Sequence, residues 1–297
     1  MNYIILDLEW NSAYSEHEGR FVNEIIEIGA VRLDEQLNET GRYQQLVRSR
    51  LNKKLSSRTK NLTHITNEDM RSGIPFEKAI ADFTAWAGND TLTLTWSNTD
   101  IYVMRENLKL FLNRSRVDFI GLYADLQKFI QYKLGITGNQ ISLGAAVEAA
   151  GLDVAKYEAH RALGDVLACA DLFRLMFDEK ELLRYIVNTA TDEYYARMDF
   201  KPYYINDLNS SDIDRAKMQF SCEECGRPMK RKSKWQYRNN AFRADFLCSK
   251  CDNMYSGRVG FKKTFDGVIV KRRLVRSENT EVVKSVEQSH EKSTENA

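Results

Sequence analysis

The sequence contains no apolar run long enough to cross a membrane, which takes about 20 consecutive apolar residues. It has 297 residues, 43% of them hydrophobic, and a mean hydropathy of −0.50, values typical of a globular protein. It also lacks a basic leader, and its apolar start includes Asp7 and Glu9, so we do not expect a signal peptide. We therefore expect a cytoplasmic protein without a membrane partner, long enough for one large domain and a small one.

Net charge is also small, only +1, but it is unevenly distributed along the chain. Residues 221–276 contain fifteen Lys and Arg against five Asp and Glu. Residues 277–297 contain two Lys and five Glu, so residues 1–220 carry a net charge of −6. A basic segment of this kind indicates a polyanionic partner.

Cysteine is scarce, and four of the five cysteines form two Cys-x-x-Cys pairs separated by twenty-two residues. The pairs are Cys222 with Cys225 and Cys248 with Cys251. This spacing predicts one structural Zn²⁺ in a small β-rich zinc ribbon, because four thiolates leave no open coordination position. A redox dithiol pair is the alternative that the pattern leaves open. Cys169 lies in a helical apolar pattern and is expected in the core.

Basic and aromatic residues alternate within the segment that we expect to form the basic zinc ribbon, residues 221–276. Cations that contact phosphates and aromatic rings that stack on bases are what a single-strand binder needs. The candidate nucleic-acid contacts are Lys230, Lys232, Lys234, Trp235, Tyr237 and Arg238. A solvated basic face and a protein-docking ribbon are the alternatives. We expect a linker over residues 201–220 and a disordered acidic tail over residues 277–297.

Two acids, Asp7 and Glu9, interrupt the apolar run at residues 3–10, which predicts a buried β-strand. Side chains alternate between the faces of a strand, so both acids point the same way. Burying two unpaired carboxylates side by side is costly, and a divalent cation such as Mg²⁺ or Mn²⁺ would compensate. A strand end where both acids reach water or an arginine is the alternative.

The order of the predicted elements describes an α/β fold with a mixed sheet. Three strands without intervening helices, followed by alternating strands and helices, predict an antiparallel meander joined to parallel strands. The strands are expected at residues 3–10, 24–33, 42–47, 91–96 and 119–122, with a polar loop at 11–23. Helices are expected at residues 66–87, 100–112, 125–134, 142–151, 162–177 and 181–198.

Two further acids lie where such a sheet would bring them beside the first strand. Asp100 follows the predicted strand at 91–96, at the edge where α/β sheets place their sites. Asp165 comes five residues after His160, a spacing of about 140° on a continuous helix. Both can face one centre only if His160 precedes the helix and Asp165 lies in its second turn. Gly164 removes side-chain bulk beside that turn. Taken singly, each residue is typical of an ordinary cap or helix surface.

Together these residues resemble the DEDDh 3′→5′ exonucleases, in which Asp-x-Glu is followed by an Asp about ninety residues on and then by His-x₄-Asp. Residues 24–31, 62–66 and 142–146 also resemble segments of that family, so the likeness spans residues 1–180. Asp-Leu-Glu-Trp and Trp-Ser-Asn-Thr-Asp look closest to the branch of the histone-mRNA and KapD-like exonucleases. One departure is His64, which stands where the family commonly has glycine.

The resemblance implies an RNase H-like fold over residues 1–200, with helices flanking the sheet. It also implies a metal-dependent exonuclease that releases nucleoside 5′-monophosphates from the 3′ end of single-stranded nucleic acid. In the site that it implies, two Mg²⁺ or Mn²⁺ ions are bound by Asp7, Glu9, Asp100 and Asp165, and His160 is the general base.

Leu8 and Trp10, beside the acids, are candidate contacts for the terminal nucleotide, with core packing as the alternative. The branch resemblance makes RNA the expected substrate. A single-stranded DNA exonuclease and a non-catalytic nucleic-acid-binding regulator with the same fold are the alternatives.

Overall fold

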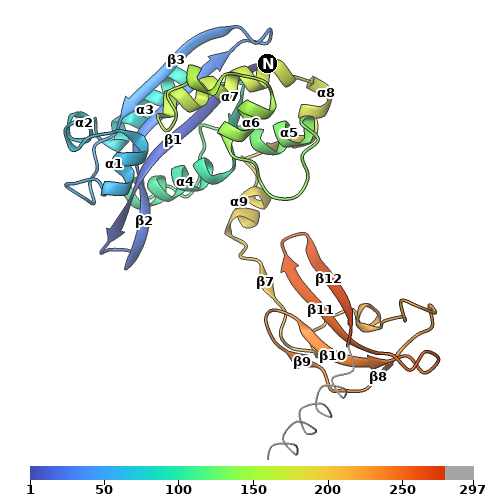
Figure 1. Ribbon diagram of the computed structural model, residues 1–297. Coiled ribbons are helices and arrows are strands. Elements are labelled where there is room, and N and C mark those ends of the chain that lie inside the picture. Colours follow the sequence, from blue (N-terminus) through green and yellow to red (C-terminus); the bar gives the residue numbers. More distant parts are fainter. Residues whose placement is uncertain (278–297) are drawn as a thin grey trace, which may run out of the picture. The chain divides into compact units, whose positions relative to one another are not determined.

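The structure is a computed structural model that describes residues 1–277 and divides the chain into two compact units after Met198 (Figure 1). Each unit is described by itself. Most of the expected acidic tail, residues 278–297, lies outside the described residues. Among the helices that the structure describes, none has both the length and the apolar character that a membrane crossing requires.

The first unit is built around a mixed sheet of six strands in the order β3-β2-β1-β4-β5-β6. The pairs β3–β2 and β2–β1 are antiparallel, whereas β1–β4 and β4–β5 are parallel, so the predicted meander and parallel strands are confirmed. The strands are β1 (Asn2–Ser15), β2 (Arg20–Leu33), β3 (Glu39–Leu46), β4 (Thr91–Thr95), β5 (Leu122–Asp125) and β6 (Ile186–Asn188).

Helices cover both faces of this sheet, as expected for the fold (Figure 1). The α-helices in the described residues are α1 (Ser57–Thr63), α2 (Asn67–Ser72), α3 (Phe76–Ala87), α4 (Thr99–Leu112), α5 (Leu126–Lys133), α6 (Leu143–Ala149), α7 (Ala162–Met176), α8 (Glu179–Leu182) and α9 (Asp192–Asp199). Short 3₁₀ segments lie at Val154–Lys156, Leu183–Tyr185 and Arg215–Met218.

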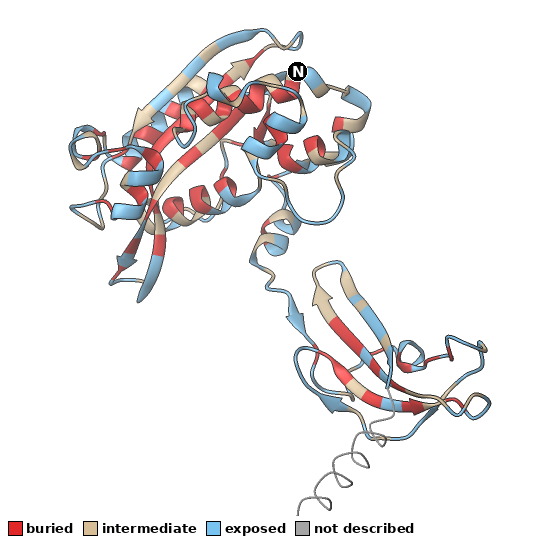
Figure 2. Ribbon diagram, in the orientation of Figure 1, coloured by how far each residue is buried: buried red, intermediate tan, exposed pale blue. Residues whose placement is uncertain are grey.

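Buried residues of the first unit lie along its central strands and on the helices that cover them (Figure 2), and alternation along β1 divides this core into two layers. Tyr3 and Ile5 pack with α5, α6 and α7 on one face of the sheet. Ile4, Leu6 and Leu8 pack with α3 and α4 on the other face. Because the period of a strand is two residues, Asp7 and Glu9 continue the row of Tyr3 and Ile5 toward α7.

Several boundaries differ from those that the sequence predicts. The expected polar loop at 11–23 is wrong, because β1 and β2 pair as far as Ser15 and Arg20 and bury Ala13 and Val22. The expected helix at 66–87 is two helices, α2 and α3, separated by Gly73 and Pro75. Pro75 is the N-cap of α3, a position where its missing N–H costs no helix hydrogen bond.

The C-terminal part of the first unit also departs from the prediction. The strand expected at 119–122 begins only at Leu122, and Asp125 ends it as the N-cap of α5. The expected continuous helix at 181–198 is interrupted by β6, which adds an antiparallel edge strand beside β5. Thr189 helps to close this edge by donating its backbone N–H to the carbonyl of Gly121.

The second unit contains a β-sheet with its own hydrophobic core. Its main strand order is β12-β11-β10-β8, with β7 paired to β11 and β9 to β10. The strands are β7 (Tyr203–Tyr204), β8 (Lys230–Arg231), β9 (Gln236–Tyr237), β10 (Phe242–Leu247), β11 (Met254–Thr264) and β12 (Gly267–Arg276). This is the small C-terminal β-rich module that the cysteine pairs predict.

Residues 201–220, expected as a linker, contribute to this core. Tyr203 and Tyr204 pair with β11, and Ile205 and Phe220 are buried against Phe261 and its neighbours. The apolar residues of this stretch give the small sheet a cover that 221–276 alone would lack.

Candidate active site

The C-terminal part of β1 places Asp7 and Glu9 at a free edge of the sheet. β4 pairs with β1 only from Asn2 to Ile5, so the following N–H groups on that side have no strand partner. Asp100, in the first turn of α4, fills this position, because its Oδ1 accepts the backbone N–H of Leu8 at 3.2 Å. The hydrogen bond fixes a third carboxylate beside the first two.

The opposite side of the site depends on a close approach between β2 and α7. Gly29 lies opposite Asp7, and a Cβ at Gly29 would come within 2.5 Å of the backbone of Ala162. Buried Glu27 anchors the start of α7 by accepting from Arg161 at 2.7 and 3.1 Å and from the N–H of Ala162 at 3.2 Å. These contacts bring Asp165 over the acids of β1.

Sequence reasoning did not single out the Glu27–Arg161 pair. A signal was present, because Glu27 is an acid with apolar neighbours on both sides, Ile26 and Ile28. Such a residue needs a buried partner. The sequence could not show that the partner is Arg161, which lies 134 residues further on.

The carboxylates of Asp7, Glu9 and Asp165 offer oxygens that all lie within 4.8 Å of one another. Burial raises the pKa of Asp7 well above its usual range, and the neighbouring carboxylates raise it further. Burial, followed by the charge of Asp165, also raises the pKa of Glu9 to about 8. The surrounding protein therefore does not neutralise the negative charges that these carboxylates would carry.

The pKa values of the two remaining acids, Asp100 and Asp165, are also raised. Burial raises the pKa of Asp100 to about 7, although the hydrogen bond from Leu8 acts in the other direction. Burial raises the pKa of Asp165 as well, partly offset by the charge of His160. Hard oxygen donors in a half-buried anionic cluster are what divalent cations such as Mg²⁺ bind, so the residues present fit such a group.

His160 lines one cavity of about 470 Å³ together with Asp7, Glu9 and Asp165, whereas Asp100 is buried. His160 lies before α7, as its spacing from Asp165 predicts, with an exposed side chain and a left-handed backbone (φ 61°). Asp165 lies in the first turn of α7 rather than in the second. Both expected nucleotide contacts line the cavity but differ in exposure, since Trp10 is half-buried whereas Leu8 is only 2% exposed and packs in the core.

Helix α1 forms another wall of the cavity and was not expected from the sequence. Its N-cap Ser56 and the following turn are attached to β1, since Asn11 Oδ1 accepts from the Ser56 N–H at 3.2 Å and the Thr59 hydroxyl at 2.9 Å. The helix ends at His64 in the left-handed conformation (φ 57°). Glycine adopts this conformation most easily, which explains why a family would use it here.

Gly164 allows the turn that carries His160 to fold against α7. A Cβ at Gly164 would lie 1.9 Å from the carbonyl oxygen of Glu158, so the predicted need for little bulk is confirmed. We expect Gly164→Ala to lower the stability of the first unit by roughly 1–3 kcal/mol, because the backbone must shift. Thermal denaturation checks this, with Gly144→Ala in α6 as the control, since nothing lies within 4 Å of its added Cβ. Equal melting temperatures for both variants would contradict the proposed close contact.

The second unit gathers its four cysteines into one cluster. The sulfur atoms of Cys222, Cys225, Cys248 and Cys251 lie within 4.8 Å of one another, and Cys225 Sγ is 3.5 Å from Cys248 Sγ. A tetrahedral zinc with Zn–S bonds of about 2.3 Å separates its sulfurs by about 3.8 Å. The four residues therefore fit a single tetrahedral metal ion, and none of them is in a disulfide.

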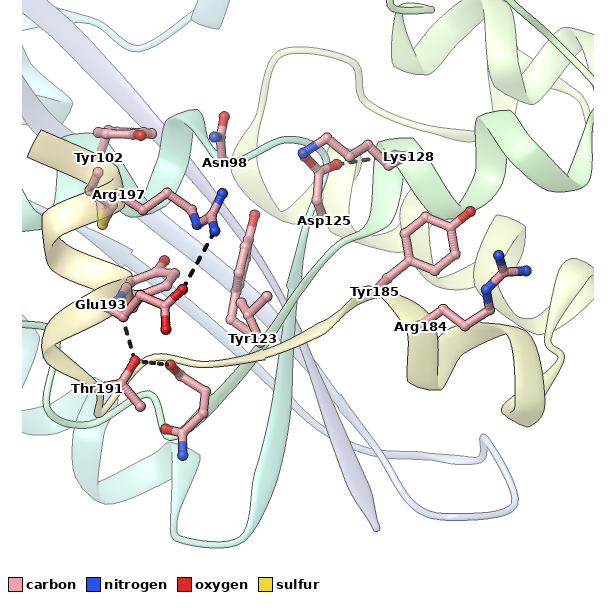
Figure 3. A pocket seen from close by; sticks show the side chains of 14 residues that line it. Asn98, Tyr102, Tyr123, Asp125, Lys128, Arg184, Tyr185, Thr191, Glu193 and Arg197 are labelled. Carbon is pink, nitrogen blue, oxygen red and sulfur yellow. Dashed lines mark hydrogen bonds and ion pairs between the residues drawn. The ribbon is translucent and has the colours of Figure 1, made fainter. Parts of the chain in front are cut away.

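Figure 3 shows a second cavity of the first unit, with a volume of about 550 Å³. Its cations are paired: Lys128 lies 3.1 Å from Asp125, and Arg197 lies 3.6 Å from Glu193. The guanidinium of Arg184 is similarly paired, with Glu181. This cavity therefore offers neither the carboxylate cluster of β1 nor unpaired cations for a phosphate.

Comparison with known proteins identifies the first unit. Residues 4–173 match the exonuclease family RNase_T. The chain is 30% identical over 185 residues to the probable 3′-5′ exonuclease KapD of Bacillus subtilis, covering 61% of this chain and 86% of that protein.

Solved structures show the same fold. The nuclease domain of 3′hExo, a DEDDh family member bound to rAMP, superposes with a TM-score of 0.55 at 23% identity, covering 63% of this chain and 96% of that one. A 3′-exonuclease that recognises the histone mRNA stem-loop gives 0.52 at 21% identity, covering 59% and 80%. Since the family model matches more than half of the chain, the chain belongs to the RNase_T exonuclease family and is a metal-dependent 3′→5′ exonuclease acting on nucleic acid.

Proposed function

We propose that this protein removes nucleotides as nucleoside 5′-monophosphates from the 3′ end of single-stranded RNA. The observation that carries the proposal is the convergence of Asp7, Glu9 and Asp165 within 4.8 Å, beside Asp100, in a cavity open to an incoming strand end. The rAMP bound to the nuclease domain of 3′hExo belongs to the class of product that we propose.

Within this proposal Asp7, Glu9, Asp100 and Asp165 hold two Mg²⁺ or Mn²⁺ ions. Bound divalent cations lower the pKa of water and offset the negative charge of a phosphodiester. The exposed imidazole of His160 accepts a proton from the attacking water at one of its ring nitrogens. Trp10, at the border of the cavity, offers an aromatic face to the terminal base.

His160→Ala tests the proposed proton transfer. We expect a rate loss of about 10²–10⁴-fold with metal affinity retained, because the variant removes the base and leaves every carboxylate in place. Single-turnover rates and Mn²⁺ binding by calorimetry measure the two effects separately. His17→Ala is a matched control, since His17 is an exposed histidine in the turn between β1 and β2. A rate for His160→Ala close to that of the control would remove His160 from the mechanism.

Preference for RNA rests on the histone mRNA stem-loop bound by one structural relative and on the resemblance to its branch. The test compares kcat/KM for RNA and DNA strands of identical sequence. Identification of the released product by chromatography completes this test. A faster reaction on RNA with nucleoside 5′-monophosphates as products supports the proposal, and a faster reaction on DNA would replace RNA with single-stranded DNA.

For the second unit we propose one structural Zn²⁺ bound by the four cysteines, and a role in holding the nucleic-acid strand. Of the expected contacts, Lys230, Lys232 and Arg238 are exposed, as are Lys234 and Tyr237. Trp235 is half-buried against Phe246, with Arg231 over its ring, so it is only partly available for base stacking.

A further inference from the structure

The strand register of the second unit places three arginines in a row across its sheet. Arg243 on β10 lies directly opposite Arg258 on β11, which in turn lies opposite Arg273 on β12. Residues that face each other in an antiparallel ladder project from the same side of the sheet. We call these three residues the arginine row.

The arginine row is not neutralised within the described part of the chain. None of its three members forms an ion pair with a carboxylate of residues 1–277. The nearest acid in the register, Asp245, lies two residues along β10 and is opposite Ser256 instead. Like charges directly opposite one another destabilise a sheet, so the row costs stability unless an anion compensates.

A second observation points to a missing acceptor. The Nε of Arg243 is buried, and no hydrogen-bond partner in the described residues accepts from it. Buried donors are ordinarily satisfied, because an unpaired one carries the full cost of desolvation. Arg258 is held in place, since its Nη2 donates to the carbonyl of Asn239 at 3.0 Å.

A cavity of about 310 Å³ lies next to the arginine row and includes Arg258 and Arg273 in its walls. Gly260, opposite Lys271, and Ala241 provide little side-chain bulk there. Tyr204 also lines the cavity, 37% exposed, with Lys262 over its ring. The cavity therefore combines several cations with an aromatic face.

We propose that the arginine row and this cavity bind the phosphates of a single nucleic-acid strand. Guanidinium groups bind phosphate through paired N–H donors, and Arg258 and Arg273, exposed at the walls of the cavity, supply such donors. The inference rests on the proposed function of the second unit and deepens it, because it identifies the principal contact surface. Sequence reasoning chose its candidate contacts from residues 230–238 of the basic segment, which also includes Arg243 and Arg273. It could not align these two with Arg258, because the three residues are fifteen positions apart and meet only through strand pairing.

The test uses the double variant Arg258→Gln/Arg273→Gln in the full chain. A matched control, Lys217→Gln/Lys250→Gln, removes two exposed positive charges of the same unit that belong neither to the row nor to the walls of the cavity. Fluorescence anisotropy measures binding of a labelled single-stranded RNA of about 20 nucleotides, longer than the ~4–16 that one module covers. No Mg²⁺ or Mn²⁺ is added, and zinc content and circular dichroism verify folding.

We expect the row variant to weaken binding about tenfold at ~0.15 M salt and to reduce the slope of log K against log salt by about 1.4. Both figures correspond to two lost phosphate contacts on a single strand, at about 0.7 each. The control variant should reduce the affinity and the salt slope by less than the row variant does. Folded row variants that bind like the control, or binding by the wild type that is independent of salt, would overturn the inference.

Turnover of a dinucleotide separates this inference from the proposed nuclease activity. A dinucleotide has a single phosphodiester, which the acids of the first unit would hold during cleavage and which then leaves no phosphate for the arginine row. We therefore expect the row variant to degrade it at the wild-type rate. If the wild type degrades neither the dinucleotide nor the RNA of about 20 nucleotides when Mg²⁺ or Mn²⁺ is present, the nuclease proposal fails. The anisotropy comparison still tests the arginine row in that case. A matching loss on the dinucleotide would show that the row variant disturbs the first unit, which contradicts a separate strand-binding site.

Discussion

Asp7→Asn is expected to abolish turnover and at the same time to stabilise the metal-free protein. Asp7 belongs to the carboxylate cluster that fits divalent cations, so the variant removes a negatively charged ligand. It also removes one of several like charges, and burial, followed by the repulsion among these charges, holds the pKa of Asp7 well above its usual range. Without metal, that repulsion opposes folding at neutral pH.

The expected gain is an increase in melting temperature of about 2–4 °C without metal, the change that ~1 kcal/mol produces in a domain of this size. Differential scanning calorimetry of the metal-free protein, together with a turnover assay in Mn²⁺, measures both effects. Asp82→Asn is the control, because Asp82 is an exposed aspartate on α3, away from the cluster. An active Asp7→Asn variant, or one that is less stable without metal, would show that the acids are not arranged around a cation.

Cys248→Ser is expected to unfold the second unit while leaving the first folded. The sheet of the second unit is small, and structural zinc in such modules contributes on the order of 10 kcal/mol. Cys248 is 1% exposed and its Sγ lies close to that of Cys225, so serine would leave an incomplete and buried ligand set. Hydrogen exchange should show lost protection in β10, β11 and β12 and unchanged protection in β1 and β2.

Cys169→Ala is the matched control, since Cys169 is a buried cysteine of the first unit outside the cluster. It should retain one zinc per chain, measured by elemental analysis, whereas Cys248→Ser should lose it. Retained protection in the second unit of Cys248→Ser, with no zinc bound, would show that apolar packing alone stabilises this unit.

Local patterns in the sequence are sufficient for part of this account. The alternation along residues 3–10 predicts the shared face of Asp7 and Glu9, and helical geometry requires His160 to precede α7. The two cysteine pairs likewise predict their own cluster. In each case the decisive geometry is set within a few residues or by a fixed motif spacing.

The features that the sequence did not reveal depend on contacts between distant segments. The Glu27–Arg161 pair joins β2 to α7, and α1 is attached to β1 through Asn11. Edge strand β6 pairs with β5, and its three residues, Ile186–Asn188, are too few to interrupt a helical pattern in the sequence. Tertiary contacts decide such cases, since propensities in short segments are weak.

The most direct test of the central claim is a time course with RNA and DNA strands labelled at the 5′ end. Wild type and Asp7→Asn are compared in Mg²⁺ or Mn²⁺, with a sample that contains EDTA. We predict a metal-dependent ladder that shortens from the 3′ end with the wild type and an unchanged strand with Asp7→Asn. Intact strands with folded, zinc-loaded wild type in both metals, or shortening that Asp7→Asn leaves unaffected, would contradict the assignment of catalysis to the acids of β1.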